Sequence, residues 1–284
     1  MTRVQGLLTQ RRYADGPALS AQFFCPRDVA VDQAGNVYVA ELGNNRIRKI
    51  DTSGNVTTLA GNGTQGYADG TGSASGTAEF NGPAGVAVDS RGNVYVADLG
   101  NQRIRTIDAS GSVKTLAGNG DAGYVDGTGG ANGTAEFYGP NGIAVDDSGH
   151  VYVADVDNNR IRQIDSSGNV TTLAGNGYGS PRSGGFVDGT GGANGTAEFF
   201  SPWVIAVDRG GNVYVGDTGN NRLRKIDPCG NVTTLAGNGT AGDVDGTGGA
   251  TGMAELWGPY GVAVDAAGNV YAENNDGRLR RIVP

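Results

Sequence analysis

Short apolar runs rich in β-branched residues alternate with Gly, Asn, Asp and Ser along most of the chain. Between residues 83 and 118 such runs occupy 85–89, 94–98, 103–108 and 113–118. Runs of this length and composition, separated by turn residues, predict β-strands. Because the three intervening turns are short, consecutive strands must lie side by side and antiparallel. The stretch therefore predicts a four-stranded antiparallel meander.

The same pattern recurs along the chain. The copies begin at Pro26, Pro83, Pro140, Pro202 and Pro259, at spacings of 57, 57, 62 and 57 residues. The extra five residues fall in the loop around residues 178–186. One small sheet cannot bury both faces, whereas copies stacked around an axis can. We therefore expect residues 1–284 to form a single all-β domain, a five-bladed β-propeller of four-stranded antiparallel blades.

The ends of the chain complete one repeat between them. The last copy stops after its third strand, while residues 4–8 (VQGLL) align with the outer-strand sequence VTTLA. Residues 13–16 align with residues 67–70, and residues 21–23 with residues 78–80. We expect residues 1–25 to provide a closing strand and loop. The closing strand would be the outer strand of the last blade and would close the ring.

The copies resemble a known repeat. The pattern G-[VI]-A-V-D-x-x-G-N-V-Y-V-A-D-x-x-N-x-R-I-R-x-I resembles the NHL repeat, and the linking TLAGNG…GY.DGTG…AEF resembles bacterial NHL-type proteins. The resemblance spans nearly the whole chain and implies a propeller. It leaves function open, because NHL propellers include protein-binding, RNA-binding and enzymatic members. NHL propellers are more commonly six-bladed, whereas this chain has five copies.

Composition and charge narrow the classes of partner. The 52 glycines fall at matching turns and in the linking loops, and the formal net charge is −8. A nucleic-acid binder needs a basic stripe, so no nucleic-acid partner is expected. No apolar run reaches 18 residues, so no membrane insertion is expected. We expect a monomer and favour a secreted or cell-surface bacterial protein over a cytoplasmic one, without a decisive signal for compartment.

Charged residues that recur in every copy are expected to hold the blade together. An acid ends the second strand and an arginine begins the third, as in Asp98 and Arg103. The turn between them predicts an ion pair across the hairpin; a ring of these acids around an axial cation is the alternative. Asp89 and its equivalents should cap turns. Arg105 and its equivalents should lie between blades, paired with acids.

Single residues outside the repeat pattern receive structural interpretations. His150, the only histidine, replaces the Asn of a turn, and a zinc site built mainly from histidines is excluded. Cys25 and Cys229 lie in connections at opposite ends of the blades, so both are expected to be free thiols.

The candidate site consists of positions that vary between near-identical copies. They lie in the connection that enters each blade, on the same face as the turn between the second and third strands. The candidate ligand-binding residues are Phe24, Arg27, Asp28, Asn141, Phe200, Trp203, Trp257 and Tyr260. The aromatic members fall in the fourth, fifth and first blades and would form an arc suited to a sugar ring or a peptide side chain. The alternative is that they fill a small core beneath the loops.

The favoured function is a non-enzymatic binding or scaffold propeller that engages a protein or carbohydrate ligand on its loop face. No catalytic residue, metal ligand or cofactor is assigned; calcium in the loop at residues 123–137 is an alternative, although the EF-hand spacing is absent. A hydrolase or lyase of NHL or gluconolactonase-like type is the enzymatic alternative. The resemblance implies axial acids and amides, or several histidines, for such enzymes, whereas the matching positions offer only Asp28 and Asn141. The third hypothesis is that the chain is a recently amplified or engineered propeller without a dedicated ligand.

Overall fold

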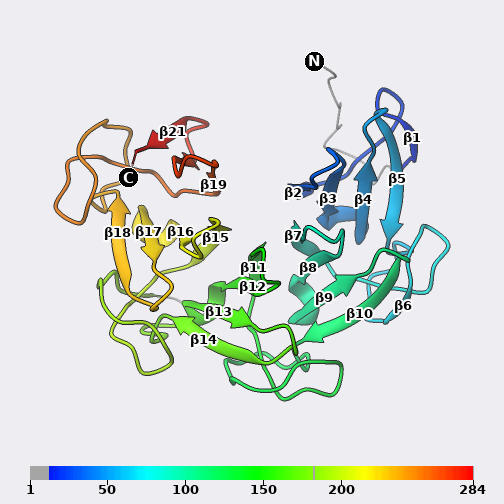
Figure 1. Cartoon of the computed structure of the whole chain (residues 1–284), viewed down its shortest axis with the longest axis horizontal. Helices are drawn as coiled ribbons and strands as arrows, with labels where there is room; N and C mark the ends of the chain where they lie inside the picture. The colour runs from blue at the N-terminus through cyan, green and yellow to red at the C-terminus, as the bar shows by residue number, and fades with distance from the viewer. Residues whose placement is uncertain (1–12, 182, 284) are drawn as a thin grey trace.

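Five antiparallel sheets are arranged around an axis in the computed structural model, which describes residues 13–181 and 183–283 (Figure 1). The inner strands of the five blades pack beside one another in chain order. They are β2 (Pro26–Val31), β7 (Pro83–Val88), β11 (Pro140–Val145), β15 (Pro202–Val207) and β19 (Gly261–Val264). The sheet arrangement confirms the five-bladed all-β propeller expected from the repeats.

Each blade continues outward from its inner strand. The second strands are β3 (Val37–Glu41), β8 (Val94–Asp98), β12 (Val151–Asp155), β16 (Val213–Asp217) and β20 (Val270–Glu273). The third strands are β4 (Arg46–Ile50), β9 (Arg103–Ile107), β13 (Arg160–Ile164), β17 (Arg222–Ile226) and β21 (Leu279–Ile282). The outer strands are β5 (Asn55–Ala60), β10 (Ser112–Ala117), β14 (Val170–Ala174) and β18 (Val232–Ala236).

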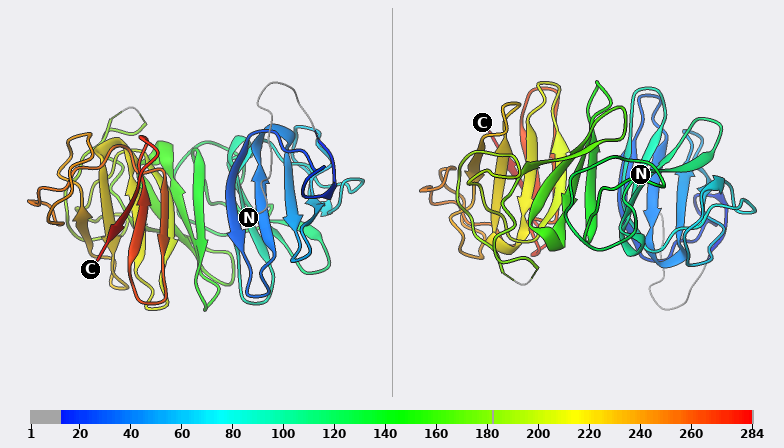
Figure 2. Two further views of the ribbon diagram at one scale, coloured as in Figure 1. Left: turned by 90° about the horizontal axis from the view of Figure 1, so that it is seen from above. Right: turned by 90° about the horizontal axis from the view of Figure 1, so that it is seen from below.

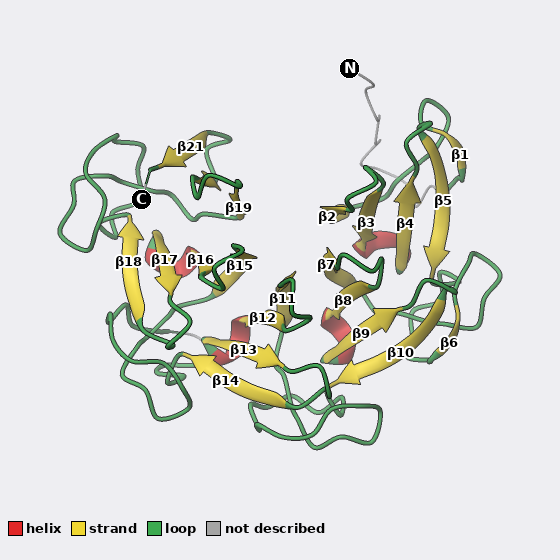
Figure 3. Ribbon diagram, viewed as in Figure 1, coloured by secondary structure: helices red, strands yellow, loops and turns green. Residues whose placement is uncertain are grey.

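Short elements complete the blades. Two-residue strands β1 (Gly16–Pro17) and β6 (Gly70–Thr71) pair with β5 and β10 and give the first two blades a fifth strand. In the first four blades a 3-10 turn joins the second strand to the third (Figure 3). These turns are η1 (Leu42–Asn44), η2 (Leu99–Asn101), η3 (Val156–Asn158) and η4 (Thr218–Asn220). Among the described residues, no helix has the length and apolar character needed to cross a membrane.

The first and last blades flank an opening in the arc (Figure 1). Within the described residues the last sheet has three strands, β19, β20 and β21. The strand predicted to close it, residues 4–8, lies outside the described residues. The neighbouring alignment is confirmed, because the hydroxyls of Tyr13 and Thr58 lie 2.7 Å apart, as those of Tyr67 and Thr115 lie 3.0 Å apart.

The hydrophobic core lies between the blades, which stand side by side in Figure 2. Alternate residues of each strand face opposite sides of its blade, so every blade has two apolar faces. Tyr38, Ala40 and Ile47 of the first blade pack against Val86 and Val96 of the second, and the later junctions repeat this arrangement. Because each blade covers its neighbour, equivalent positions of the repeat are buried at successive junctions.

A fully buried arginine on the third strand joins each of the first four blades to the loop that precedes it. Arg105 donates from Nη1 to Asp98 (2.9 Å) and from Nη2 to Asp69 (2.6 Å). The same guanidinium donates to the carbonyls of Glu79 (3.1 Å) and Ala68 (2.8 Å). The equivalent arginines are Arg48, Arg162 and Arg224. The prediction that these arginines pair with acids between blades is confirmed.

The predicted ion pair across the hairpin was assigned to the wrong arginine. Asp98 and Arg103 are directly opposite in the register, yet Asp98 pairs with Arg105, two residues further along β9. The Arg103 guanidinium instead lies over the Tyr67 ring at 3.8 Å and donates to the carbonyls of Asn101 and Asn119. The arginine between the blades provides the buried partner that a desolvated carboxylate requires, because a buried charge must be paired.

The turns between the first and second strands follow their predicted chemistry. Asp89 accepts hydrogen bonds from the backbone of Arg91 and Asn93 and from the side chains of Asn93 and Tyr95. In the third blade the Nδ1 atom of His150 lies 3.0 Å from Asp146 Oδ2, where the other blades place an Asn amide. The interpretation of His150 as a turn residue is confirmed. Cys25 and Cys229 are both free and exposed, as expected.

Removing the buried arginine should destabilise the fold strongly. We expect Arg105→Met to lower the free energy of unfolding by about 3–5 kcal/mol, because Asp98 would be left buried without its partner. Arg103→Met, on the same strand, removes a more exposed guanidinium and should cost less. Urea denaturation of both variants measures the difference. Equal losses would contradict the assigned role of Arg105.

The tyrosines that close these turns should make the fold sensitive to alkali. Burial and the carboxylate of Asp89 raise the pKa of Tyr95 from 10.0 to about 12, and Tyr38, Tyr152 and Tyr214 are raised to the same value. Between pH 10 and 12 the unfolded chain loses these protons while the folded chain keeps them, so stability falls as pH rises. Absorbance titration of tyrosinate should show a late step that coincides with unfolding. A single step near pH 10 with the fold intact would contradict this.

Candidate functional site

The connection that enters each blade lies on the same face as the turn between its second and third strands. In the second blade the backbone N–H of Asn81 donates to Asp98 (2.8 Å), and the N–H of Gly100 donates to the Asn81 carbonyl (2.8 Å). The predicted loop face is therefore present, and the variable positions of the repeats lie on it.

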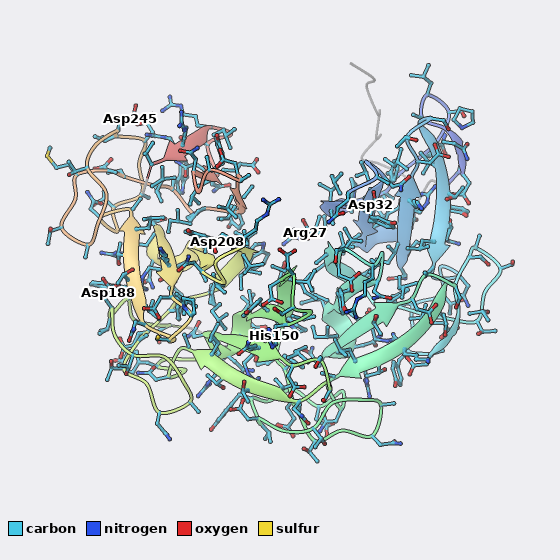
Figure 4. The ribbon with its side chains drawn as sticks, in the orientation of Figure 1. Arg27, Asp32, His150, Asp188, Asp208 and Asp245 are labelled. Carbon is cyan, nitrogen blue, oxygen red and sulfur yellow. The ribbon has the colours of Figure 1, made fainter. Side chains whose placement is uncertain are left out.

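Three of the predicted site residues meet at the axis. The Trp203 and Tyr260 rings pack edge to face, with centroids 5.8 Å apart and an interplanar angle of 87°. The Arg27 guanidinium lies over the Trp203 ring, 4.9 Å from its centroid. Figure 4 shows Arg27 near the axis. We call Arg27, Trp203 and Tyr260 the axial cluster; it joins the first, fourth and fifth blades.

Close packing of the inner strands explains which copies can carry side chains here. A Cβ atom on Gly85 would lie 2.1 Å from the carbonyl oxygen of Asn141, and one on Gly142 would lie 2.8 Å from that of Trp203. Glycine at both positions lets neighbouring strands approach. Asp28 occupies the same repeat position in the first blade, and Val204 occupies it in the fourth. At this position only the first and fourth blades carry side chains, and the last blade again has glycine, Gly261.

A groove of about 550 Å³ lies beside the axial cluster. Arg27, Asp28 and Val29 of β2 form one wall; Tyr260, Glu273 and Leu279 of the last blade form the other. The Asp28 carboxylate accepts from the backbone N–H of Val86 (2.9 Å) and of Val29 (2.8 Å), yet burial raises its pKa. The groove therefore combines apolar surface with one cation and two acidic side chains.

The remaining predicted residues lie elsewhere on the loop face. The Phe24 and Phe200 rings lie against Gly43 and Gly219 in the 3-10 turns of their own blades. The Trp257 carbonyl accepts from the N–H of Asn275 (2.8 Å), and Asn141 is buried on β11. The predicted arc thus separates into an axial cluster and three aromatic residues that occupy equivalent positions over the turns.

Two groove residues were missed by the sequence reasoning. Glu273 stands where Ala40, Ala97 and Ala154 are fully buried against the next blade. Leu279 is 70% exposed, whereas its equivalents at the other junctions are fully buried. The signal for Glu273 is present in the sequence, because it is the one charged residue at a second-strand position that is alanine or glycine in the other four copies.

The histidine and the loop considered for metal binding lie away from this groove. His150 lies in the turn between β11 and β12, at the end of the blade away from the loop face, and bonds Asp146. In the loop considered for calcium, Asp126 accepts from Arg162 (2.7 Å) and Thr172 (2.9 Å). Over residues 13–181 and 183–283, no three His, Cys, Asp or Glu side chains are grouped to hold a metal.

Comparison with known proteins identifies the repeat. The family model described as "NHL repeat" matches residues 23–50, 80–107, 137–164 and 199–226. Each match runs from the connection that enters a blade to the end of its third strand. The chain is an NHL-repeat β-propeller. The matches end at residue 226, before the blade that carries Glu273 and whose turn between the second and third strands is one residue shorter.

Relatives share parts of this NHL propeller. It is 36% identical to human NHL repeat-containing protein 3 over 31% of this chain and 23% of that protein. It is 29% identical to Teneurin-1 of Gallus gallus over 74% of this chain and 8% of that protein. The chain spans between 3% and 23% of the length of these curated relatives.

Solved structures show the same fold at low sequence identity. A nidogen/laminin complex chain matches with a TM-score of 0.57 and 17% identity, over 91% of this chain and 80% of that one. An auxiliary nutrient binding protein from Bacteroides thetaiotaomicron matches with a TM-score of 0.56 and 17% identity, over 99% of this chain and 75% of that one. Catalytically inactive virginiamycin B lyase from Staphylococcus aureus with quinupristin matches with a TM-score of 0.52 and 13% identity, over 98% of this chain and 73% of that one. These likenesses concern the fold alone.

Close approach of the NHL inner strands should make Gly85 intolerant of a side chain. We expect Gly85→Ala to destabilise the propeller by about 1–3 kcal/mol, because the new Cβ would collide with backbone rather than with a flexible side chain. Gly210→Ala, in an exposed turn, is the matched control and should change stability by about 0.5 kcal/mol or less. Thermal unfolding compares them, and equal effects would contradict the close packing at the axis.

Proposed function

We propose that this NHL-repeat propeller is a binding protein that holds its ligand in the groove beside Arg27, Trp203 and Tyr260. The main observation behind the proposal is that variable residues of three blades meet at the axis: Arg27 and Tyr260 line one groove, and both contact Trp203 beside it. The residues that recur in the copies stabilise the blades and their turns. Variation gathered at one place on the loop face is typical of a site carried by a rigid scaffold.

The chemistry of the groove favours a peptide segment as the ligand. Aliphatic side chains such as Val29 and Leu279 provide an apolar surface that a peptide side chain can cover. Arg27 offers guanidinium donors on one wall, and Glu273 offers a carboxylate on the other. Aromatic and arginine side chains are the residue types that dominate binding energy in protein interfaces. A carbohydrate stacked on Tyr260 or Trp203 is the alternative to be tested.

The two tryptophans provide a reporter and a matched control. In a Trp257→Phe variant, Trp203 becomes the only tryptophan, so a ligand in the groove should change its fluorescence directly. Peptide and glycan arrays screened with the whole chain would first identify a ligand. We expect that ligand to shift Trp203 emission and to bind the Trp257→Phe variant with unchanged affinity.

Truncation of the axial cluster should abolish binding. We expect Trp203→Ala and Tyr260→Ala each to weaken binding at least tenfold with little change in melting temperature, because Tyr260 is 45% exposed and Trp203 is partly exposed. Isothermal titration and thermal unfolding provide the two measurements. Unchanged affinity would contradict the proposed site, and a large loss of stability would show that these rings serve as a loop core.

A further inference from the structure

Two acidic side chains line the groove beside the axial cluster at positions where the other copies have small or apolar residues. Asp28 takes the position of Gly85, and Glu273 takes that of Ala97. Asp28 belongs to β2 of the first blade and Glu273 to β20 of the last, and these two blades flank the opening of the arc (Figure 1). Both departures from the repeat therefore place a carboxylate in the same groove.

The Asp28 carboxylate has hydrogen bonds but no cation paired with it. Its Oδ1 and Oδ2 atoms accept from the backbone N–H groups of Val29 and Val86. Over residues 13–181 and 183–283, no Lys, Arg or His side chain forms an ion pair with it. Burial raises the pKa of Asp28, because desolvation disfavours a charged carboxylate. A carboxylate can accept about four hydrogen bonds, so Asp28 can receive further donors.

The Glu273 carboxylate lies over the inner strand of its own blade. A Cβ atom on Gly261 would lie 2.9 Å from Glu273 Oε2, so this carboxylate occupies the space that glycine leaves open on β19. The Glu273 side chain has neither a hydrogen bond nor an ion pair within the part of the chain that the structure describes. Its equivalent Ala97 is fully buried against the next blade, whereas Glu273 is exposed in the groove.

The cation on the groove wall does not neutralise these acids. Arg27 is the one cationic side chain among the described residues that line the groove. Its guanidinium lies over the Trp203 ring, 4.9 Å from the centroid, and forms no ion pair with Asp28 or Glu273. The groove therefore has an excess of negative charge and two carboxylates that lack a cationic partner.

The rest of the groove suits an aliphatic chain. Val29 is 60% exposed and Leu279 70%, although their equivalents Val86 and Ile47 are buried at the junction of the first two blades. Lysine and arginine side chains cover apolar surface with their aliphatic stems while their charged heads stay with polar partners. The Tyr260 ring, 45% exposed on the same groove, is a face that attracts a cation.

We propose that the axial groove selects a peptide ligand that carries a lysine or arginine side chain. The cationic head pairs with Asp28 and Glu273, and the aliphatic stem lies along Val29 and Leu279. An ammonium or guanidinium group supplies the partner that both carboxylates lack, and a partly desolvated charge requires such a partner. This inference rests on the proposed function, because it names the class of ligand for the same groove.

Matched peptide arrays test the charge that the groove selects. The probes are acetylated, amidated heptapeptides without tryptophan, each with one central lysine or arginine and each paired with the same sequence carrying norleucine or citrulline there. The Trp257→Phe chain reports binding through Trp203 emission. We expect the tightest sequences to contain the cation, and its replacement to weaken binding about tenfold, as the loss of one partner of a charge pair does.

The outcomes separate this inference from the proposed function. A peptide that shifts Trp203 emission equally with and without its cation would support the groove as a binding site and overturn its selectivity for a cation. A ligand found only among glycans would overturn it as well. If neither peptides nor glycans change Trp203 emission, the proposed function fails, and the inference fails with it.

Substitution of the two acids tests which groups receive the cation. We expect Glu273→Ala and Asp28→Gly each to weaken binding of the lysine peptide about tenfold and to leave the norleucine peptide unchanged. Each variant introduces a residue that other copies have at that position, so the fold should be retained. Asp147→Asn removes the same charge from an exposed turn of the third blade and should change neither affinity.

Two results of this comparison would overturn the inference. An equal loss in Asp147→Asn would show that the net charge of the chain, and not the groove, attracts the cation. An equal loss for the lysine and norleucine peptides in Glu273→Ala would show that the carboxylate does not act on the cation. Thermal unfolding of every variant checks the fold, and if Asp28→Gly is unfolded, Glu273→Ala decides.

Discussion

The buried arginine of each of the first four blades makes the ion pairs on which the rest of the structure depends. Arg48, Arg105, Arg162 and Arg224 are fully buried, and each joins an acid at the end of the second strand to an acid in the preceding loop. Burial raises the pKa of Asp155 and Asp217 to about 6, although their arginines favour the charged form. Such a pair adds little net stability relative to an apolar pair, but a wrong arrangement leaves a charge buried alone. The arginines therefore fix the glycine-rich loops, which have few apolar side chains, in one position against the blades.

The same acids also hold the connections that form the loop face. The acid that pairs with the arginine also accepts the backbone N–H of the entering connection, as Asp98 does from Asn81 and Asp155 from Tyr138. In the second and third blades the inner strands approach so closely that only glycine fits at the second position after the conserved proline. Variation is tolerated beside the opening, where Arg27, Trp203 and Tyr260 meet.

The last blade differs from the other four at two positions of its second strand. Asn274 replaces the buried acid, and neither polar atom of its side chain has a hydrogen-bond partner. Arg280 consequently depends on Asp245 alone among the two acids that its equivalents use. Glu273 replaces a buried alanine and faces the groove shared with the first blade.

The sequence determined the strands, the turns and the number of blades, because period-two apolar patterning and turn residues act locally and recur five times. It also identified the positions most free to vary, which include Arg27, Trp203 and Tyr260. Only the tertiary structure decided which variable residues meet: Phe24, Phe200 and Trp257 belong to the same sequence class but lie over their own turns. It likewise decided that Asp98 pairs with Arg105 and not with Arg103, because both arginines are on one face of the strand and only the packing of the preceding loop distinguishes them. Local pattern specifies each blade, whereas contacts between distant blades and loops specify the site.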